Sequence, residues 1–321
     1  MATHYFVSCH CCITFFLLVI CKGIMGTSTF TFKNRCDYIV WPGILSSAGS
    51  TPLDSTGFEL SPGESRSFQA TPGWSGRFWG RTGCTFDANG QGSCATGDCG
   101  SNQMSCNGAG ATPPATLAEF TIGSGSGSGS NALDFYDVSL VDGYNLPMAV
   151  DASGGTGACG TTGCVTDLNR MCPNELRAGD GQACKSACEA FGNPEYCCSG
   201  SFGSPDTCRP SVYSEMFKSA CPRSYSYAYD DATSTFTCMG ASYTITFCPG
   251  STSQKSSTVP SVSSGTTTNA PPMIHRDPEP QGDPNGSSWL PSFSIGGSSR
   301  GISSNAATLT LTSFIVLFFQ I

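Results

Sequence analysis

Residues 90–99, GQGSCATGDC, place Cys94 and Cys99 among glycines and small polar residues that favour turns. The chain of 321 residues contains 20 Cys, 39 Gly and 20 Pro, a composition that disfavours long helices and predicts a disulfide-rich domain. None of the three histidines lies between Cys36 and Cys248, so this region cannot build a Ser-His-Asp triad, a Cys-His dyad or a histidine-ligated zinc site. Any catalysis in it must depend mainly on carboxylates.

Residues 1–26 have the pattern of a secretory signal peptide. Residues 13–20 form a short apolar run, and the small residues Gly23, Gly26 and Ser28 follow it. Because this run is too short to span a bilayer, we expect cleavage near Gly26 rather than a signal anchor. Four of the 20 cysteines would leave with the peptide.

The end of the chain resembles a glycolipid-anchor signal. Residues 301–321 contain an uncharged apolar tail, 309–321 (LTLTSFIVLFFQI), and small residues precede it. Residues 251–300 are rich in Ser, Thr, Pro and Gly, so they cannot bury enough apolar surface to fold, and they contain the glycosylation sequon at Asn285. We therefore expect an extracellular, monomeric domain, residues 27–250, held by a stalk and a GPI-type anchor at the plasma membrane or cell wall.

Sixteen cysteines remain after the signal peptide, an even number that predicts eight disulfides. Cys197 and Cys198 are neighbours, and a bridge between adjacent residues is strained, so each needs a different partner. The spacing leaves the other pairings open. Zinc is disfavoured by the lack of histidine and by the secretory route, and no other cofactor is indicated.

Short alternating runs of apolar and polar residues, bounded by Gly, Pro or Asn, predict strands in an antiparallel sandwich or barrel. A loop-rich, cysteine-rich stretch with brief helices interrupts them, so we expect a cleft between a β core and a second lobe. The predicted strands are residues 29–33, 117–122, 135–141, 234–238 and 243–247, and the predicted helices are residues 185–191 and 212–220.

Several segments together resemble the thaumatin-like proteins, the pathogenesis-related group five family. Residues 90–99 look like the family signature, and the match extends over residues 29–249 with all sixteen cysteines of the long family form. The other matching segments are 34–36 (NRC), 40–42 (VWP), 76–82 (GRFWGRT), 113–120 (PPATLAEF), 135–145 (FYDVSLVDGYN), 196–198 (YCC) and 225–238, which ends STFTC.

The resemblance implies a mainly β fold: a thaumatin-like antiparallel β-sandwich core, a disulfide-rich lobe of loops and short helices, and a small third lobe. It also implies the disulfide pairs. These are Cys36 with Cys248, Cys84 with Cys94, Cys99 with Cys106, Cys159 with Cys238, Cys164 with Cys221, Cys172 with Cys184, Cys188 with Cys197, and Cys198 with Cys208.

The resemblance also implies an acidic cleft lined by one Arg, one Glu and three Asp. The matching positions are Arg77, Glu119, Asp137, Asp142 and either Asp231 or its neighbour Asp230, with the spacing to Cys238 favouring Asp231.

Without the family, these residues have ordinary interpretations. Glu119 would be an exposed strand residue, Asp142 before Gly143 a turn former, and Arg77 a member of a surface ion pair. Asp137 and Asp142 are five positions apart, so they can line one cleft only if the strand bends or ends before Asp142.

The family suggests β-1,3-glucan of fungal or plant walls as the ligand, in a defence role, because some members are credited with weak endo-β-1,3-glucanase activity and others bind the glucan without cutting it. Glycoside hydrolysis requires two carboxyl groups, and Glu119 and Asp142 would be that pair. The alternatives are a non-catalytic wall or receptor-associated module that binds a protein, and an inhibitor of a secreted hydrolase. Residues 29–250 contain 11 Lys and Arg against 20 Asp and Glu, which argues against nucleic-acid binding.

Two stretches depart from the family pattern near these residues. Residues 124–130 (SGSGSGS) lengthen the connection between the strands of Glu119 and Asp137, and we expect a flexible loop there. Residues 199–207, between Cys198 and Cys208, are more numerous than usual for the family.

Overall fold

The structure is a computed structural model, and it describes residues 27–124 and 132–250. The predicted signal peptide, the stalk with Asn285 and the anchor signal all lie outside these residues, as does most of the Ser- and Gly-rich stretch 124–130. The described residues belong to a single compact unit. Within them, no helix has both the length and the apolar character needed to cross a membrane.

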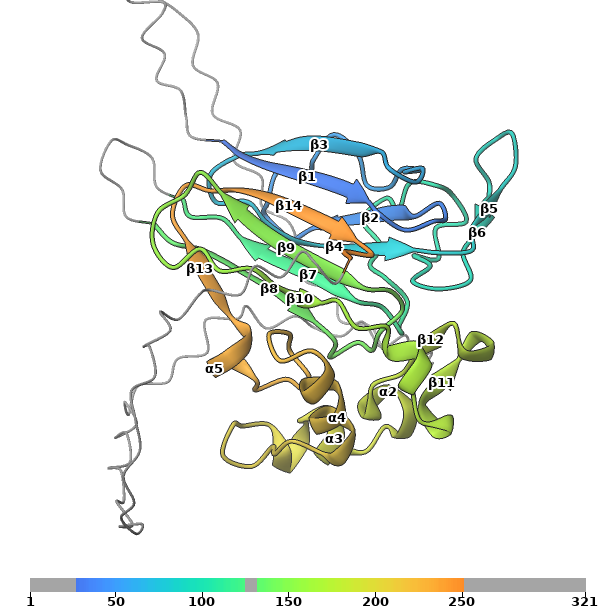
Figure 1. The fold of residues 1–321 in the computed structure, drawn as a ribbon, viewed down its shortest axis with the longest axis vertical. Coiled ribbons are helices and arrows are strands. Elements are labelled where there is room, and N and C mark those ends of the chain that lie inside the picture. Colours follow the sequence, from blue (N-terminus) through green and yellow to red (C-terminus); the bar gives the residue numbers. More distant parts are fainter. Residues whose placement is uncertain (1–26, 125–131, 251–321) are drawn as a thin grey trace, which may run out of the picture. The chain divides into compact units, whose positions relative to one another are not determined.

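Two five-stranded sheets pack face to face in the described part of the chain, and Figure 1 shows them as two layers. One sheet has the order β10-β9-β14-β1-β3 and the other the order β13-β8-β7-β4-β2. The predicted sandwich is thereby confirmed. The strands are β1 (Ser28–Asn34), β2 (Trp41–Ser46), β3 (Ser65–Ala70), β4 (Ser75–Arg81), β5 (Thr85–Phe86), β6 (Gly92–Ser93), β7 (Leu117–Thr121), β8 (Asp134–Ser139), β9 (Met148–Ser153), β10 (Thr162–Cys164), β11 (Arg177–Ala178), β12 (Ala183–Cys184), β13 (Phe236–Cys238) and β14 (Ser242–Phe247).

One strand pair departs from the expected antiparallel arrangement. β1 runs parallel to β14, in register from Phe30 opposite Tyr243 to Asn34 opposite Phe247. Their outer neighbours keep the expected arrangement, because β1 is antiparallel to β3 and β14 is antiparallel to β9. The first and last strands of the domain therefore lie side by side in the middle of one sheet.

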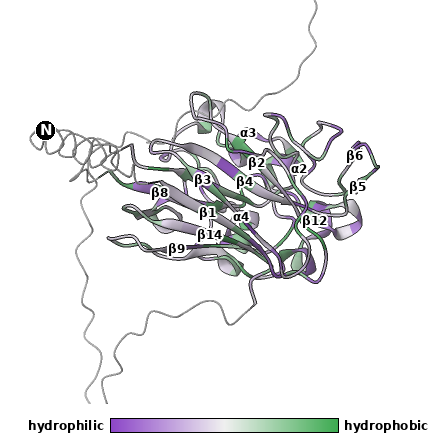
Figure 2. Cartoon of the chain, turned by 90° about the horizontal axis from the view of Figure 1, so that it is seen from above, coloured by the Kyte–Doolittle hydropathy of each residue, from purple (hydrophilic) through white to green (hydrophobic). Residues whose placement is uncertain are grey.

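Aromatic side chains fill the space between the sheets. β1 alternates buried and partly buried residues along its whole length, which directs Phe30 and Phe32 into the core. The Phe30 ring lies 4.8 Å from both Phe78 and Phe120, and 5.1 Å from Trp74, measured between ring centroids. Such pairs add about 0.5–1.5 kcal/mol each to the burial of their apolar area. Figure 2 shows the strands from above, with colours that change between hydrophilic and hydrophobic from residue to residue.

The lobe drawn below the sheets in Figure 1 contains most of the helical residues. The predicted helix at residues 212–220 is confirmed, and the one at 185–191 begins later, at Ala187, because Ser186 caps it with a bond from Glu189 N to Ser186 Oγ. The α-helices are α2 (Ala187–Phe191), α3 (Pro194–Cys197), α4 (Val212–Ala220) and α5 (Asp231–Ser234), and the 3-10 helices are η1 (Leu168–Met171), η2 (Asn174–Leu176), η3 (Gly179–Gly181) and η4 (Gly200–Phe202).

The predicted strand at residues 234–238 was only partly right. Its first part is the end of α5, closed by a hydrogen bond from Thr235 N to Asp231 O, and the strand begins at Phe236. Ser234 is buried and its Oγ accepts a hydrogen bond from Lys218 Nζ at 2.8 Å, a tertiary contact that the local pattern does not contain.

Eight disulfides join the sixteen cysteines of the described residues, in the same pairs that the resemblance implies. Cys36–Cys248 closes the whole domain with a sequence separation of 212 residues. Cys84–Cys94 and Cys99–Cys106 hold a small third region that carries the β5–β6 hairpin. Residues 199–207 lie inside the loop closed by Cys198–Cys208 and contain η4.

Candidate functional site

Arg77, Glu119 and Asp137 form a row across three adjacent strands. Arg77 of β4 lies directly opposite Glu119 of β7, and Glu119 lies directly opposite Asp137 of β8. Side chains opposite each other in antiparallel strands have Cβ atoms about 4.5–5.5 Å apart and point to the same face. Three side chains that are distant in sequence therefore meet on one face of the sheet.

This row lies on the outer face, because the alternate residues of the same strands point inward. The side chains of Phe78, Phe120 and Tyr136 are at most 4% exposed and lie in the core between the sheets. Further along the outer face, Trp79 and Leu117 are covered by the region that contains Cys99 and Cys106. The charged row therefore lies next to an apolar part of the same sheet face, and that part is covered by the region of Cys99 and Cys106.

Asp142 joins the row through a tight turn. β8 ends at Ser139, as the five-residue spacing requires, and residues 141–142 turn before Gly143, whose φ is +85°. A Cβ at Gly143 would lie 2.7 Å from Cys184 O and 2.8 Å from Pro114 Cβ, so only glycine fits there. Ala115 N donates to Asp142 O at 2.9 Å, which ties the turn to the segment that leads into β7.

Burial raises the pKa of Glu119, Asp137 and Asp142, and neighbouring charges modify each shift. Burial raises the pKa of Glu119 to about 7; the Arg77 guanidinium acts against this shift and Asp142 adds to it. Asp137, which is 3% exposed, has its pKa raised well above the usual range by burial, then by Glu119 and Asp231. Burial also raises the pKa of Asp142, and Arg77 opposes it. With a pKa of about 7, Glu119 is present near neutral pH in both its protonated and its ionised form.

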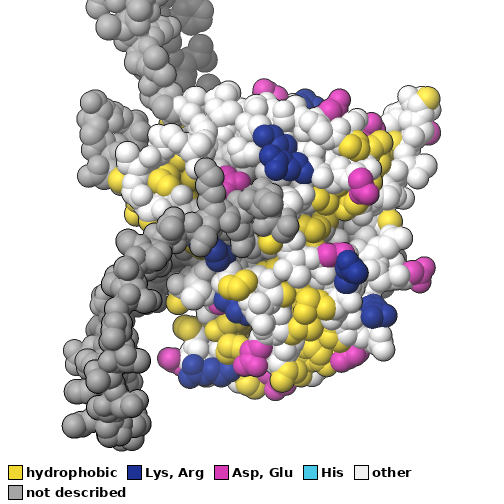
Figure 3. All heavy atoms as spheres, in the orientation of Figure 1, with side chains coloured by type: hydrophobic (Ala, Val, Ile, Leu, Met, Phe, Trp, Pro, Cys, Tyr) yellow, Lys and Arg dark blue, Asp and Glu magenta, His cyan; other side chains and the backbone are white. Residues whose placement is uncertain are grey.

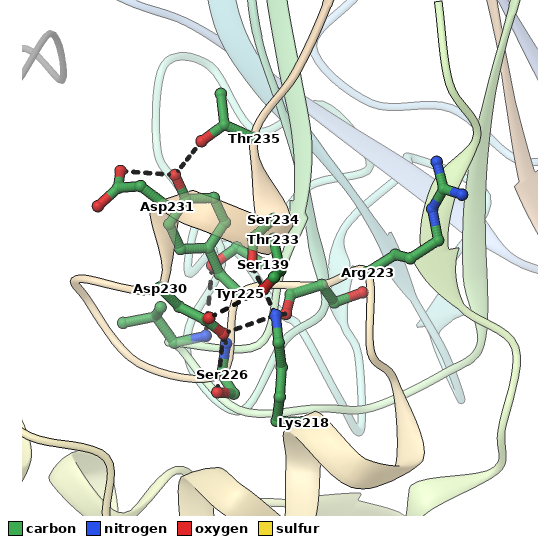
Figure 4. Close-up of polar contacts among 12 residues, drawn as sticks. Ser139, Lys218, Arg223, Tyr225, Ser226, Asp230, Asp231, Thr233, Ser234 and Thr235 are labelled. Carbon is green, nitrogen blue, oxygen red and sulfur yellow. Dashed lines mark hydrogen bonds and ion pairs between the residues drawn. The ribbon is translucent and has the colours of Figure 1, made fainter. Parts of the chain in front are cut away.

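The structure separates the roles of Asp230 and Asp231 (Figure 4). Asp230 pairs with Lys218 Nζ at 3.0 Å and accepts hydrogen bonds from Ser226 N and Oγ, both at 2.9 Å, so it holds its own loop together. Asp231 is exposed and accepts a hydrogen bond from Tyr225 Oη at 2.8 Å. Because the charge of Asp231 raises the pKa of Asp137, Asp231 is the better candidate for the acidic group.

Tyr225 connects this loop to the strand that bears Asp137. Leu140 N donates to Tyr225 O at 2.8 Å, and Tyr225 N donates to Val138 O at 2.9 Å, next to Asp137. The Tyr225 hydroxyl contacts both Asp231 and Thr235. Burial is the main cause of the raised pKa of this hydroxyl, which therefore stays protonated and can donate to Asp231. We refer below to Arg77, Glu119, Asp137, Asp142 and Asp231 as the acidic cluster.

Glu189 of α2 is a further carboxyl that the sequence interpretation missed. Burial raises its pKa to about 7, with Lys185 acting against the shift and Asp142 adding to it. Ser186 and Glu189 have the S-x-x-E spacing of a capping box, in which the glutamate returns a bond to the serine N–H. Among the described residues, Glu189 Oε2 is instead buried without a hydrogen-bond partner.

The segment that contains Glu189 is fixed close to Asp142 by backbone contacts. Tyr144 and Cys184 exchange two hydrogen bonds of 2.8 Å each, and Val141 lines the same small cavity as Ala187 of α2. The spacing of Ser186 and Glu189 by itself predicts only a local capping role for Glu189. Only the packed structure, which brings α2 near Asp142, identifies Glu189 as a neighbour of the acidic cluster.

In chemical terms the cluster offers a proton donor, a proton acceptor and a cation on one surface. A carboxyl with a pKa near 7 can donate a proton at mildly acidic pH, and a neighbouring carboxylate can accept one or assist an attacking water. Arg77 can bind an oxygen that gains negative charge. No group of three or more His, Cys, Asp or Glu within residues 27–124 and 132–250 is arranged to hold a metal ion.

Comparisons with known proteins agree with this architecture. Residues 34–249 match the Thaumatin family, more than half of the chain. Thaumatin-like protein 1 of Arabidopsis thaliana is 67% identical over 250 residues, which cover 77% of this chain and 96% of the relative. Pathogenesis-related thaumatin-like protein 3.5 of Cryptomeria japonica is 61% identical over 229 residues, covering 70% and 92% respectively.

A third relative has a name that describes an activity. A protein of Prunus avium called glucan endo-1,3-beta-glucosidase is 52% identical over 238 residues, which cover 73% of this chain and 95% of the relative. The matched residues include every strand of both sheets from β2 to β14 and all sixteen cysteines of the disulfides. The chain therefore belongs to the thaumatin family.

Proposed function

We propose that the acidic cluster binds β-1,3-glucan, in a secreted protein with a defence role. The observation that carries the proposal is the row of Arg77, Glu119 and Asp137 on the outer face of the sheet, with Asp142 beside it. Protonated carboxyls donate hydrogen bonds and ionised ones accept them, so a mixed group matches the hydroxyls of a neutral sugar chain. The Prunus avium relative named glucan endo-1,3-beta-glucosidase supports the choice of β-1,3-glucan.

Slow hydrolysis of the glucan is part of this proposal. Glu119, with a pKa of about 7, would protonate the glycosidic oxygen as the bond to the anomeric carbon breaks. Asp142, which Arg77 keeps more readily ionised, would either attack the anomeric carbon or take a proton from the attacking water. Burial, and then the charges of Glu119 and Asp231, raise the pKa of Asp137, so Asp137 would not supply the catalytic carboxylate.

The proposal also covers the segments that precede and follow the domain. Residues 1–26 would direct the chain to secretion, residues 251–300 would form a stalk with sugar on Asn285, and residues 301–321 would be exchanged for a lipid anchor. The eight disulfides suit an oxidising extracellular space. Release of the protein from membranes by a phosphatidylinositol-specific phospholipase would support the anchor, and retention after the treatment would contradict it.

The glucan proposal is tested with the purified protein and insoluble β-1,3-glucan, scoring bound protein and released reducing ends in the same sample. We expect binding that is lost in the double variant Glu119→Gln, Asp142→Asn. The matched control is Glu215→Gln on the exposed side of α4. Unchanged binding in the double variant would show that the acidic cluster is not the glucan site.

The same assay separates hydrolysis from binding. Release of reducing ends that is lost in Glu119→Gln would identify a slow glucanase, whereas binding without release would identify a lectin-like module. If the unmodified protein does not bind glucan at all, the proposal fails, and a protein ligand or an inhibited hydrolase becomes the better explanation of the cluster.

A further inference from the structure

A separate cavity of about 630 Å³ lies between one end of the sandwich and the cysteine-rich lobe. Its walls come from five parts of the chain: Tyr38 after β1, Asn145 and Pro147 before β9, Asp167, Asn169 and Arg170 at η1, Arg177 and Gly181 around the β11–β12 hairpin, and Cys248 after β14. No member of the acidic cluster lines it. The cavity is therefore a different surface from the one proposed to bind glucan.

Two arginines give this cavity a positive character. Arg177 Nε donates to Cys172 O at 3.0 Å, which anchors the side chain through a single nitrogen of its guanidinium group. Arg170 is exposed at the end of η1. Within the described residues neither arginine has a carboxylate in ion-pair contact. In Figure 3, basic side chains lie on this face in the area between the end of β14 and the β11–β12 hairpin.

The rest of the lining is polar and fixed in position. Asn169 Nδ2 donates to Asn145 O at 2.9 Å and to Gln182 O at 2.8 Å, so one amide joins two walls of the cavity. Asp167 Oδ1 accepts from Asn169 N at 3.2 Å and caps η1. Because these bonds are already made, a ligand would meet walls that need little rearrangement.

Tyr38 adds an aromatic surface. Its side chain is 42% exposed, and its hydroxyl lies 3.5 Å from Cys248 Sγ, beside the disulfide that closes the domain. Burial and the charges of Asp37 and Asp167 raise the pKa of this hydroxyl, so it remains a hydrogen-bond donor. A partly exposed ring with a polar tip is suited to the apolar face and hydroxyl edge of a sugar.

We propose that this cavity binds a uronic-acid oligosaccharide, a sugar chain that carries carboxylates. Arg170 and Arg177 would bind sugar carboxylates in the bidentate geometry that guanidinium groups favour. The ring of Tyr38 would pack on one pyranose, and Asp167 would accept hydrogen bonds from its hydroxyls. The volume is within the range of about 300–1,000 Å³ typical of small-ligand sites, room for about two or three sugar rings.

The other ligand classes fit this cavity less well. A neutral glucan would leave the two guanidinium groups without a charged partner, and a polyphosphate chain has no sugar hydroxyls to donate to Asp167. A uronic acid matches both features, since it combines one carboxylate per ring with several hydroxyls.

The test uses trigalacturonate as the probe and the purified full-length protein, with affinity measured by isothermal titration calorimetry. We expect binding that weakens with added salt and falls by about tenfold or more in Arg170→Gln, Arg177→Gln. The matched control is Arg66→Gln, an exposed arginine of β3. Thermal unfolding of each variant checks that the fold is unchanged.

Ligand controls make the result specific. The methyl ester of the same trimer keeps the rings and removes the charges, so we expect it not to bind. Equal binding of the ester, equal binding of inorganic phosphate, or unchanged affinity in the double arginine variant would each overturn the proposal. Glu119→Gln should leave trigalacturonate binding unchanged, which keeps this test independent of the glucan site.

Discussion

Glu119 and Asp137 lie directly opposite each other in the antiparallel pair β7–β8, both on the outer face of the sheet. Like charges in such positions destabilise a sheet, and both carboxyls have their pKa raised by burial before any charge effect is added. The two groups therefore cannot both be ionised without cost. The free energy of unfolding therefore depends on pH, because these carboxyls bind a proton more tightly in the folded state than in the unfolded state.

The first prediction concerns pH. The pKa of Glu119 rises from 4.5 to about 7 on folding, so between these values the native state holds more protons than the unfolded chain. The free energy of unfolding should therefore be greatest below about pH 4.5 for this group and fall as pH rises through 7. Thermal unfolding midpoints measured from pH 4.5 to 8 should decrease accordingly.

The variant Glu119→Gln isolates this contribution. It should reduce the decrease in the midpoint between pH 5 and 7.5, because the glutamine binds no proton in either state. Glu215→Gln, exposed on α4, should leave the pH dependence as it is. A Glu119→Gln profile that overlays that of the unmodified protein would contradict the assignment.

The second prediction concerns the reach of Asp142. Its charge raises the pKa of Glu119 and of Glu189, so Asp142→Asn should lower both pKa values. The backbone contact from Ala115 N to the residue-142 carbonyl is retained in this variant. Carbon-13 NMR titration of the glutamate carboxyls measures the change, with the exposed Asp206→Asn as control. If the Glu189 pKa does not move, α2 does not border the acidic cluster in solution.

The third prediction concerns the clamp that carries Asp231. Lys218→Met removes the ion pair with Asp230, whose side chain is 11% exposed, and the hydrogen bonds to Ser224 O and Ser234 Oγ. Leaving Asp230 without its cation should lower the free energy of unfolding by about 1–3 kcal/mol. Urea unfolding measures the loss, and Glu215→Gln on the same helix should change it by less than about 0.5 kcal/mol. A loss no larger than that of the control would show that the pair is dispensable.

The fourth prediction compares two disulfides. Chain entropy assigns about 5 kcal/mol to Cys36–Cys248, with a separation of 212 residues, and about 2 kcal/mol to Cys99–Cys106, with a separation of 7. Replacing each pair with alanine should therefore lower the free energy of unfolding by clearly different amounts. Denaturant unfolding measures the free energy of unfolding of the two variants. An equal loss of free energy in both would show that strain or residual structure, rather than loop length, determines the contribution of the two bridges.

The sequence was sufficient for the features that depend on local pattern. Alternation of apolar and polar residues predicted the strands that became β1 and β7, and the local pattern predicted the helix at residues 212–220. The five-residue spacing of Asp137 and Asp142 required the turn that the structure contains. Family resemblance added the disulfide pairs, which spacing alone left open.

The features that the sequence did not predict depend on tertiary contacts. The parallel pairing of β1 and β14 depends on strands more than 200 positions apart. Asp230 and Asp231 differ in role because Lys218 of α4 reaches the first and Tyr225 reaches the second. Glu189 was not predicted, because only the packed structure places its partly buried carboxyl near Asp142.

The position of β14 between β9 and β1 has a consequence for how the protein is made. A ribosome delivers β1 and β9 long before β14, and until then each presents an unpaired edge that can recruit another chain. The thiol of Cys36 likewise cannot form its native disulfide until Cys248 has been synthesised, and it can form wrong disulfides with other cysteines before then. Newly synthesised chains are therefore open to wrong strand and disulfide pairing until translation has passed residue 248, and a truncation before Ser242 would remove the strand that connects β9 to β1.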